Sequence, residues 1–189
     1  MTIRIIPKID IKNGRVIKGI NLEGLRVLGD PNNFSKHYYQ TGADEIIYLD
    51  TIASYYGTTT ILKSIKQTAK NIFIPLTAGG GIRSLSHAKN ILESGADKVC
   101  INSQVIKNCV FLKKLSKEIG SSNITSIVEV IKIDNKYYIT SGSGRNLEKQ
   151  NPLEWAKKLQ DLGAGEILLI CVNEDGVKSG FDLKIVNNI

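Results

Sequence analysis

Three consecutive glycines, Gly79 to Gly81, follow a short apolar stretch that runs from Phe73 to Thr77. The stretch predicts a strand covered on both faces, as in a parallel sheet. Because glycine has no Cβ, backbone N–H groups in such a turn can approach an anion closely. Ser84 then predicts the cap of a helix over residues 85–94, whose first turn adds partial positive charge. We expect a phosphate site that includes Gly80 and Gly81, although a tight turn without a ligand explains the glycines equally well.

Two carboxylates, Asp10 and Glu129, lie at the ends of predicted strands over residues 3–9 and 124–130. Carboxylates on opposite strands suit a general acid and a general base that work on two sides of one substrate. A single acid at a strand end is more often solvated or caps a helix. The symmetric pair beside a phosphate site favours catalysis.

Three further polar residues and a polar loop follow predicted strands. Asp50 and Asn102 close two of them, and Lys18 lies in a hairpin after the first strand, where it could neutralise a phosphate or remain a surface lysine. Residues 173–180 form a polar, glycine-containing loop that could lie over a ligand or serve only as a turn.

Strands and helices that alternate along the chain must position these groups. The predicted strands cover residues 3–9, 45–49, 73–77, 98–101, 124–130 and 166–172. The predicted helices cover residues 31–40, 59–70, 85–94 and 110–119, with two more beginning at Pro152 and Asp182. Asn13-Gly14 and Asp134-Asn135 predict two hairpins.

This alternation requires a largely parallel sheet, which is either an open doubly wound sheet or a closed barrel. An internal repeat favours the barrel. The segment 42–49 recurs as 163–170, about 120 positions later, and Asp10 and Glu129 are related by nearly the same offset. We therefore expect an α/β chain of the (β/α)8 TIM-barrel type, truncated at the C-terminus to about six strand-helix units. Residues 1–189 would form a single barrel domain, incomplete at its C-terminal end.

Composition excludes several classes of protein. The chain has 189 residues, of which 42% are hydrophobic and 23% charged, so disordered and collagen-like chains are excluded. No signal peptide and no membrane span are predicted, and we expect a cytoplasmic protein with three reduced cysteines. The net charge of +7 comes from scattered lysines, which favours solvated helix faces over nucleic-acid binding. We predict no metal and no cofactor.

An ordered set of motifs along the whole chain resembles the cyclase subunit of imidazole glycerol phosphate synthase. The motifs are residues 14–19 (GRVIKG), 42–45 (GADE), 74–77 (IPLT), 79–83 (GGGIR), 95–99 (GADKV), 101–103 (INS), 163–169 (GAGEILL) and 175–180 (DGVKSG). The resemblance implies an enzyme that joins ammonia to a phosphoribulosyl-formimino aminoimidazole carboxamide ribonucleotide. The products would be imidazole glycerol phosphate and an aminoimidazole carboxamide ribonucleotide.

The resemblance also implies roles for particular residues. Asp10 matches the first catalytic aspartate of the family, and Glu129 stands where the family has its second. Residues that match substrate-binding or phosphate-binding positions are Lys18, Asp50, Gly81, Asn102, Ser103, Asp175 and Gly176. The ammonia would come from a separate glutaminase subunit, docked at the N-terminal face of the barrel. The ammonia gate on that face would consist of Arg4, Glu45, Lys98 and Glu166, which could neutralise one another in a ring.

The sequence also departs from the family pattern. Glu129 carries one more methylene than the family's aspartate, Lys8 replaces a small or neutral residue beside Asp10, and Ile170 replaces a threonine. Residues 53–57 (ASYYG) look more like cyclase-like paralogues from surface-glycan gene clusters. Two alternatives therefore remain: a subunit that conducts ammonia for sugar amidation, and an inactive fragment.

Overall fold

A computed structural model describes residues 3–53 and 60–189, and the chain divides into two compact α/β units. The first unit contains Met1–Ile17 and Val27–Cys100, and the second contains Lys18–Arg26 and Ile101–Ile189. Each unit has a mixed sheet, in which parallel strands adjoin an antiparallel hairpin.

The sheet of the first unit is built around β1 (Lys8–Lys12), which pairs with strands on both sides. On one side it forms an antiparallel hairpin with β2 (Arg15–Ile20). On the other side it runs parallel to β4 (Ile46–Asp50), which is followed by β5 (Leu76–Gly79) and β6 (Lys98–Ile101). These parallel strands are short and almost continuously buried, as expected for strands covered on both faces.

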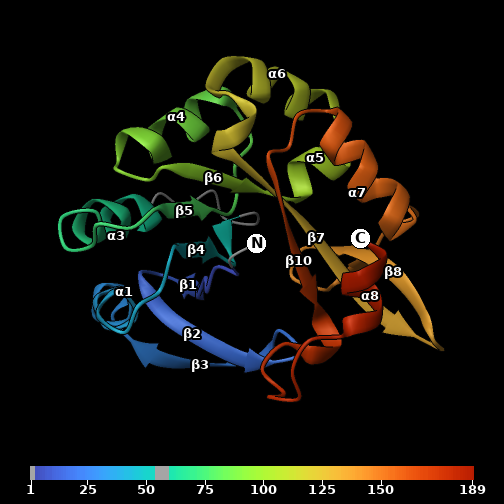
Figure 1. Ribbon diagram of the computed structural model, residues 1–189, viewed down its shortest axis with the longest axis horizontal. Coiled ribbons are helices and arrows are strands. Elements are labelled where there is room, and N and C mark those ends of the chain that lie inside the picture. The colour runs from blue at the N-terminus through green and yellow to red at the C-terminus, as the bar shows by residue number, and fades with distance from the viewer. Residues whose placement is uncertain (1–2, 54–59) are drawn as a thin grey trace. The chain divides into compact units, whose positions relative to one another are not determined.

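Three helices, α1 (Pro31–Gln40), α3 (Thr60–Thr68) and α4 (Leu85–Glu93), lie along one face of this sheet (Figure 1). Side-chain caps fix two helix starts: Asp30 accepts from the Asn32 N–H, and Ser84 accepts from the His87 N–H. The buried hydroxyl of Tyr48 on β4 lies 2.7 Å from Ser35 Oγ and 2.6 Å from Thr68 Oγ1, which ties the sheet to α1 and α3.

The second unit is built around β7 (Ile124–Ile133), which runs parallel to β10 (Glu166–Cys171). A hairpin joins β7 to β8 (Lys136–Ser141), which pairs with the short β9 (Asn146–Leu147). The strand β3 (Glu23–Gly29) begins in this unit. Its helices are α5 (Ser103–Lys107), α6 (Val110–Ile119), α7 (Pro152–Asp161) and α8 (Leu183–Asn188), with 3-10 turns η1 (Ser121–Asn123) and η2 (Val172–Glu174).

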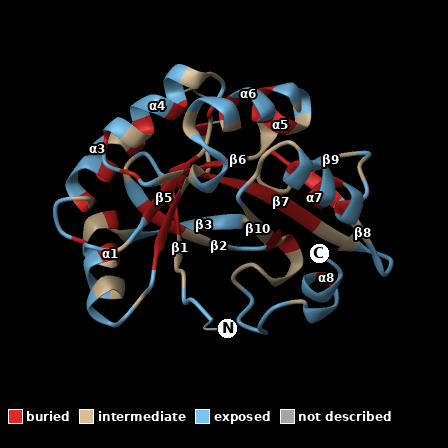
Figure 2. Cartoon of the chain, turned by 45° about the horizontal axis from the view of Figure 1, so that its top comes forward, coloured by how far each residue is buried: buried red, intermediate tan, exposed pale blue. Residues whose placement is uncertain are grey.

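Burial follows the amphipathic pattern of the sequence in both units. Figure 2 shows β5 and β7 buried, while the helices present both buried and exposed residues. In α7, Trp155, Ala156 and Leu159 are buried, and the helix packs on β7 and β8. No helix within residues 3–53 and 60–189 has the length and apolar composition needed to cross a membrane.

The structure confirms the predicted starts of the helices at Pro31, Leu85 and Pro152, and both predicted hairpins. It also corrects two strand boundaries. The first strand begins at Lys8 rather than Ile3, and the third begins at Leu76 rather than Phe73. In each case a proline, Pro7 or Pro75, comes directly before the strand, and proline has no N–H to donate to a neighbour.

A third correction concerns the two candidate catalytic carboxylates. Asp10 and Glu129 lie within β1 and β7 rather than at strand ends, because each strand continues into a hairpin. Asp10 pairs with Ile17 across its hairpin and with Leu49 on the parallel side. Glu129 pairs in the same way with Thr140 and Ile170, so the internal repeat extends to strand pairing.

Candidate active site

The ammonium group of Lys8 holds the carboxylate of Asp10. Lys8 Nζ lies 2.6 Å from Asp10 Oδ1 and 2.8 Å from Oδ2, and it donates to both. The two side chains are two positions apart on β1 and therefore project from the same face of the sheet. Their exposed fractions are 16% for Lys8 and 7% for Asp10. Solvent therefore screens this ion pair far less than it screens a surface pair.

Strand pairing places Asp10 in one row with the start of the glycine turn. Asp10 pairs with Leu49, Leu49 pairs with Gly79, and Gly79 pairs with Cys100.

Cys100 is fully buried, and desolvation raises the pKa of its thiol to about 12. The thiol is therefore protonated at neutral pH, and it is a poor candidate for a nucleophile.

The glycine turn lies against the end of β4. A Cβ on Gly80 would lie closer than 3.0 Å to the carbonyl oxygen of Asp50. A Cβ on Gly81 would also lie closer than 3.0 Å to the carbonyl oxygen of Ala53. Both glycines also have positive φ angles, 105° and 68°. Backbone packing therefore accounts for these two glycines, and their role in binding phosphate remains a prediction.

The side chain of Asp50 shapes the same turn. Asp50 is 2% exposed, and its Oδ1 accepts from the N–H groups of Ile52 and Ala53 at 3.1 Å and 3.0 Å. The structure thus brings Asp50, Gly80 and Gly81 together at the C-terminal edge of the first sheet. Residues 54–57 of the predicted paralogue motif lie outside the described residues.

Three of the four predicted gate residues meet at the opposite, N-terminal edge of this sheet. Glu45 is 1% exposed, and its Oε2 accepts from Arg4 Nη1 at 3.1 Å and from Lys98 Nζ at 2.9 Å. Its Oε1 accepts from Thr77 Oγ1 at 2.6 Å. Both carboxylate oxygens are therefore satisfied, as a buried charge requires. Thr77 was not among the predicted site residues, and its place in the sequence, after an apolar run, gave no sign of this contact.

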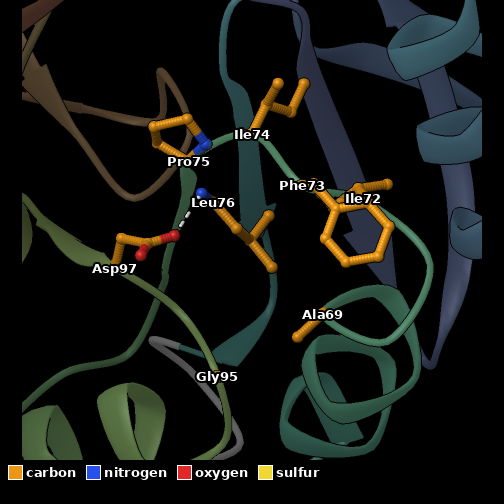
Figure 3. Close-up of a pocket in the computed structure, with 8 residues that line it drawn as sticks. All are labelled: Ala69, Ile72, Phe73, Ile74, Pro75, Leu76, Gly95 and Asp97. Carbon is orange, nitrogen blue, oxygen red and sulfur yellow. Dashed lines mark hydrogen bonds between the residues drawn. The ribbon is translucent and has the colours of Figure 1, made fainter.

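A hollow of about 360 Å³ opens at the same edge (Figure 3). The segment 72–76 lines it together with Ala69, Gly95 and Asp97, and Asp97 Oδ2 accepts from the Leu76 N–H at 2.8 Å. Six of the eight lining residues have apolar side chains, but more of the exposed lining surface is polar than apolar. Three apolar side chains are exposed at this end of the strands: Ile3 by 85%, Ile5 by 65% and Phe73 by 82%.

In the second unit, hydrogen bonds from the β7–β8 hairpin and the loop after it hold the carboxylate of Glu129. It is 5% exposed, and its Oε1 accepts from Thr140 Oγ1 at 2.8 Å and from the Gly144 N–H at 2.6 Å. Thr140 is its cross-strand partner on β8, and Gly144 belongs to the loop that follows. The hairpin predicted from Asp134-Asn135 therefore also positions the carboxylate.

The predicted residues Lys18, Asp175 and Gly176 lie together in the second unit. Lys18 Nζ lies 2.6 Å from Asp175 Oδ1, and the Asp175 carbonyl accepts from the Asn21 N–H at 2.8 Å. A Cβ on Gly176 would clash with the carbonyl of Gly19, which explains a glycine at this position. The structure therefore docks the loop after β10 onto the turn that follows β2.

The remaining predicted residues occupy strand and helix ends. Asn102 and Ser103 begin α5, and the buried Oδ1 of Asn102 has no hydrogen-bond partner among the residues that the structure describes. Glu166 begins β10, where its Oε2 accepts from Thr125 Oγ1 at 3.4 Å. The expected pairings of Asp10 with Glu129 and of Glu166 with the other gate residues join different units and remain predictions.

Within residues 3–53 and 60–189, no three His, Cys, Asp or Glu side chains cluster as metal ligands would.

Comparison with known proteins gives one consistent result. A family model described as "Histidine biosynthesis protein" matches residues 4–189. Three similar proteins, each named imidazole glycerol phosphate synthase subunit HisF, come from Legionella pneumophila, Bacillus cereus and Sulfolobus acidocaldarius; they are 40%, 42% and 44% identical to this chain. The matches cover 99%, 98% and 98% of this chain, and 89%, 74% and 75% of the relatives.

Proposed function

The chain belongs to the histidine biosynthesis protein family, and from that premise we propose that it is the cyclase subunit of imidazole glycerol phosphate synthase. Such an enzyme joins ammonia to the phosphoribulosyl-formimino ribonucleotide and releases imidazole glycerol phosphate with an aminoimidazole carboxamide ribonucleotide. The observation that carries the proposal is the identity of 40% to 44% with subunits of that name over nearly the whole chain.

Asp10 and Glu129 are the proposed catalytic pair. Ring closure with ammonia requires protons to leave the incoming nitrogen and to reach departing oxygen, which is work for positioned acids and bases. Both carboxylates are more than nine-tenths buried and are fixed by hydrogen bonds from their own unit. In this proposal they act on two sides of one substrate.

The phosphates of the substrate would be bound at strand ends and helix starts. Gly80 and Gly81 precede α4, whose first N–H groups and helix dipole favour an anion. In the second unit, Lys18 would supply a cation beside Asp175. Further polar groups for the phosphate would come from Asn102, Ser103 and Gly176. Asp50 would support the glycine turn and contact the substrate from the end of β4.

We further propose that the two units are the halves of one (β/α)8 barrel. The support is their common plan, in which a hairpin strand carries the carboxylate and a parallel strand pairs beside it. The enzyme would work in the cytoplasm, where the pathway's small phosphorylated intermediates are found.

The N-terminal edge is the proposed docking face for a glutaminase subunit. Ammonia would enter through a gate of Arg4, Glu45 and Lys98, joined by Glu166. Exposed Ile3, Ile5 and Phe73 surround that edge in the first unit and offer the apolar surface that a stable interface needs.

Substitution of Phe73 tests the docking face. With the glutaminase subunit from the same genome, Phe73→Asp should lower glutamine-dependent turnover by about tenfold or more, because it removes an apolar anchor from the interface. Ammonium-dependent turnover should stay unchanged. Phe181, which is 86% exposed in the second unit, gives the matched control Phe181→Asp. Equal glutamine dependence in the two variants would place the interface elsewhere.

The cyclase assignment is tested by genetic complementation. The gene should restore growth of a histidine auxotroph that lacks its cyclase subunit, and the purified chain should convert the ribonucleotide with an ammonium salt. A chain that supplies ammonia for sugar amidation would do neither, even if it bound a glutaminase.

A further inference from the structure

Lys8 is the residue of the candidate site to which the proposed function assigns no role. It places a second charge beside Asp10. Its Nζ lies within hydrogen-bond distance of both carboxylate oxygens, at 2.6 Å and 2.8 Å, so the ammonium spans the carboxylate edge.

The surroundings of this pair make it more than a surface contact. Lys8 pairs with Ile47 and Asp10 pairs with Leu49, so the strand next to both presents apolar side chains on their face. At 16% and 7% exposed, both groups have given up most of their hydration. Lys12, also on β1, is exposed and provides a comparison.

We propose that Lys8 is a positioning residue for the cyclase reaction: it holds the Asp10 carboxylate in one orientation, so that Asp10 presents a fixed lone pair to the substrate as a proton acceptor. The two hydrogen bonds that the ammonium donates are charge-assisted, and they fix the direction of the remaining lone pairs of the carboxylate. This role rests on the proposed cyclase function.

The proton accounting is simple. The lone pair of ammonia forms a new N–C bond at a carbonyl carbon of the substrate, while the C=O π bond breaks and its electron pair moves to the oxygen. The nitrogen then gives one proton to Asp10, which becomes neutral. Lys8 keeps its three protons and its charge throughout. The neutral Asp10 can then return the proton to departing oxygen or to water, which resets the pair.

The test measures kcat and KM for the ribonucleotide in the full chain, with an ammonium salt as nitrogen source. Lys8→Met should lower kcat by about tenfold to a hundredfold, the loss expected when a catalytic group is misplaced by roughly 1 Å. KM should stay within about twofold, because in this proposal Lys8 acts through Asp10 rather than on the substrate. Lys8→Arg keeps a cation that can donate to both carboxylate oxygens, so it should retain more kcat than Lys8→Met, although its planar fork is not equivalent to an ammonium. Lys12→Met removes the same charge from an exposed position and should leave kcat unchanged.

If Lys8→Met does not fold, Lys8→Gln keeps one donor without the charge and should show the same loss of kcat. An unchanged or higher kcat in the folded variant would overturn the role of Lys8, and so would a kcat in Lys8→Arg no higher than in Lys8→Met. Asp10→Asn separates this proposal from the one it rests on. Loss of turnover in Asp10→Asn with full turnover in Lys8→Met overturns Lys8 alone, whereas no turnover in the unsubstituted chain overturns both.

Discussion

Lys8 Nζ lies 2.6 Å and 2.8 Å from the two carboxylate oxygens of Asp10, on the same face of strand β1. Glu129, the second candidate carboxylate, accepts from a hydroxyl and a backbone N–H. The two acids therefore occupy equivalent strand positions in their units, and hydrogen bonds from the same unit fix each carboxylate.

Shortening Glu129 tests whether its hairpin positions it. Glu129→Asp withdraws the carboxylate by roughly 1 Å from Thr140 Oγ1 and the Gly144 N–H. We expect the unfolding free energy to fall by about 1–3 kcal/mol and turnover to fall by about tenfold or more. Chemical denaturation and steady-state kinetics measure both. Glu154→Asp, on the first turn of α7, is the control, and a stable, faster Glu129→Asp enzyme would refute the prediction.

The glycine turn should tolerate no side chain at its centre. Gly80→Ala adds a Cβ that meets the Asp50 carbonyl at a φ of 105°, so we expect a loss of about 3 kcal/mol or more in unfolding free energy. Gly14→Ala has a φ of 70° and no atom within 4 Å of its Cβ, so only backbone strain of about 1 kcal/mol applies. Thermal unfolding of both variants compares the two costs, and equal losses would show that the Asp50 contact is unimportant.

Residues with local signals were predicted correctly from the sequence. Asp30-Pro31, Ser84 and Asn151-Pro152 each contain the side chain that caps the helix and, in two cases, the proline that starts it, so the starts could be predicted without tertiary contacts. The same holds for the turns at Asn13-Gly14 and Asp134-Asn135.

Features that depend on distant contacts were not predictable in this way. The strand β3 was missed because most of its residues are exposed, so it has no buried alternation to mark it. Thr77 donates to Glu45 from another strand, and Thr140 donates to Glu129 across a hairpin. The separation of the two residues in the sequence predicts neither contact. The sequence placed Lys8 beside Asp10, but the hydrogen bonds to both carboxylate oxygens could be seen only in the structure.

The buried thiol of Cys100 should resist labelling. Burial raises its pKa to about 12 against an ordinary value of 9.0, so at pH 8 its thiolate fraction is about a thousandfold below that of an ordinary thiol. Native protein should therefore label at the partly exposed Cys109 first, with Cys100 reacting only after unfolding. Mass spectrometry of alkylated peptides measures this order.

The same shift has a defined effect on stability. Because the folded state favours the protonated thiol, its contribution is complete below pH 9 and is lost as pH rises toward 12. The difference in unfolding free energy between the unsubstituted chain and Cys100→Ala should shrink over that interval. A difference that stays constant from pH 8 to pH 11 would contradict burial of the thiol.

The most direct test of the account is turnover of the ribonucleotide with an ammonium salt by the Asp10→Asn variant. This change keeps the shape of the side chain and removes its charge, and we expect turnover to fall by a thousandfold or more, on the order of losses seen when a catalytic base is removed. Asp161→Asn, at the exposed end of α7, should retain full turnover. Turnover that survives Asp10→Asn undiminished would contradict the catalytic role of Asp10 on which the proposed function depends.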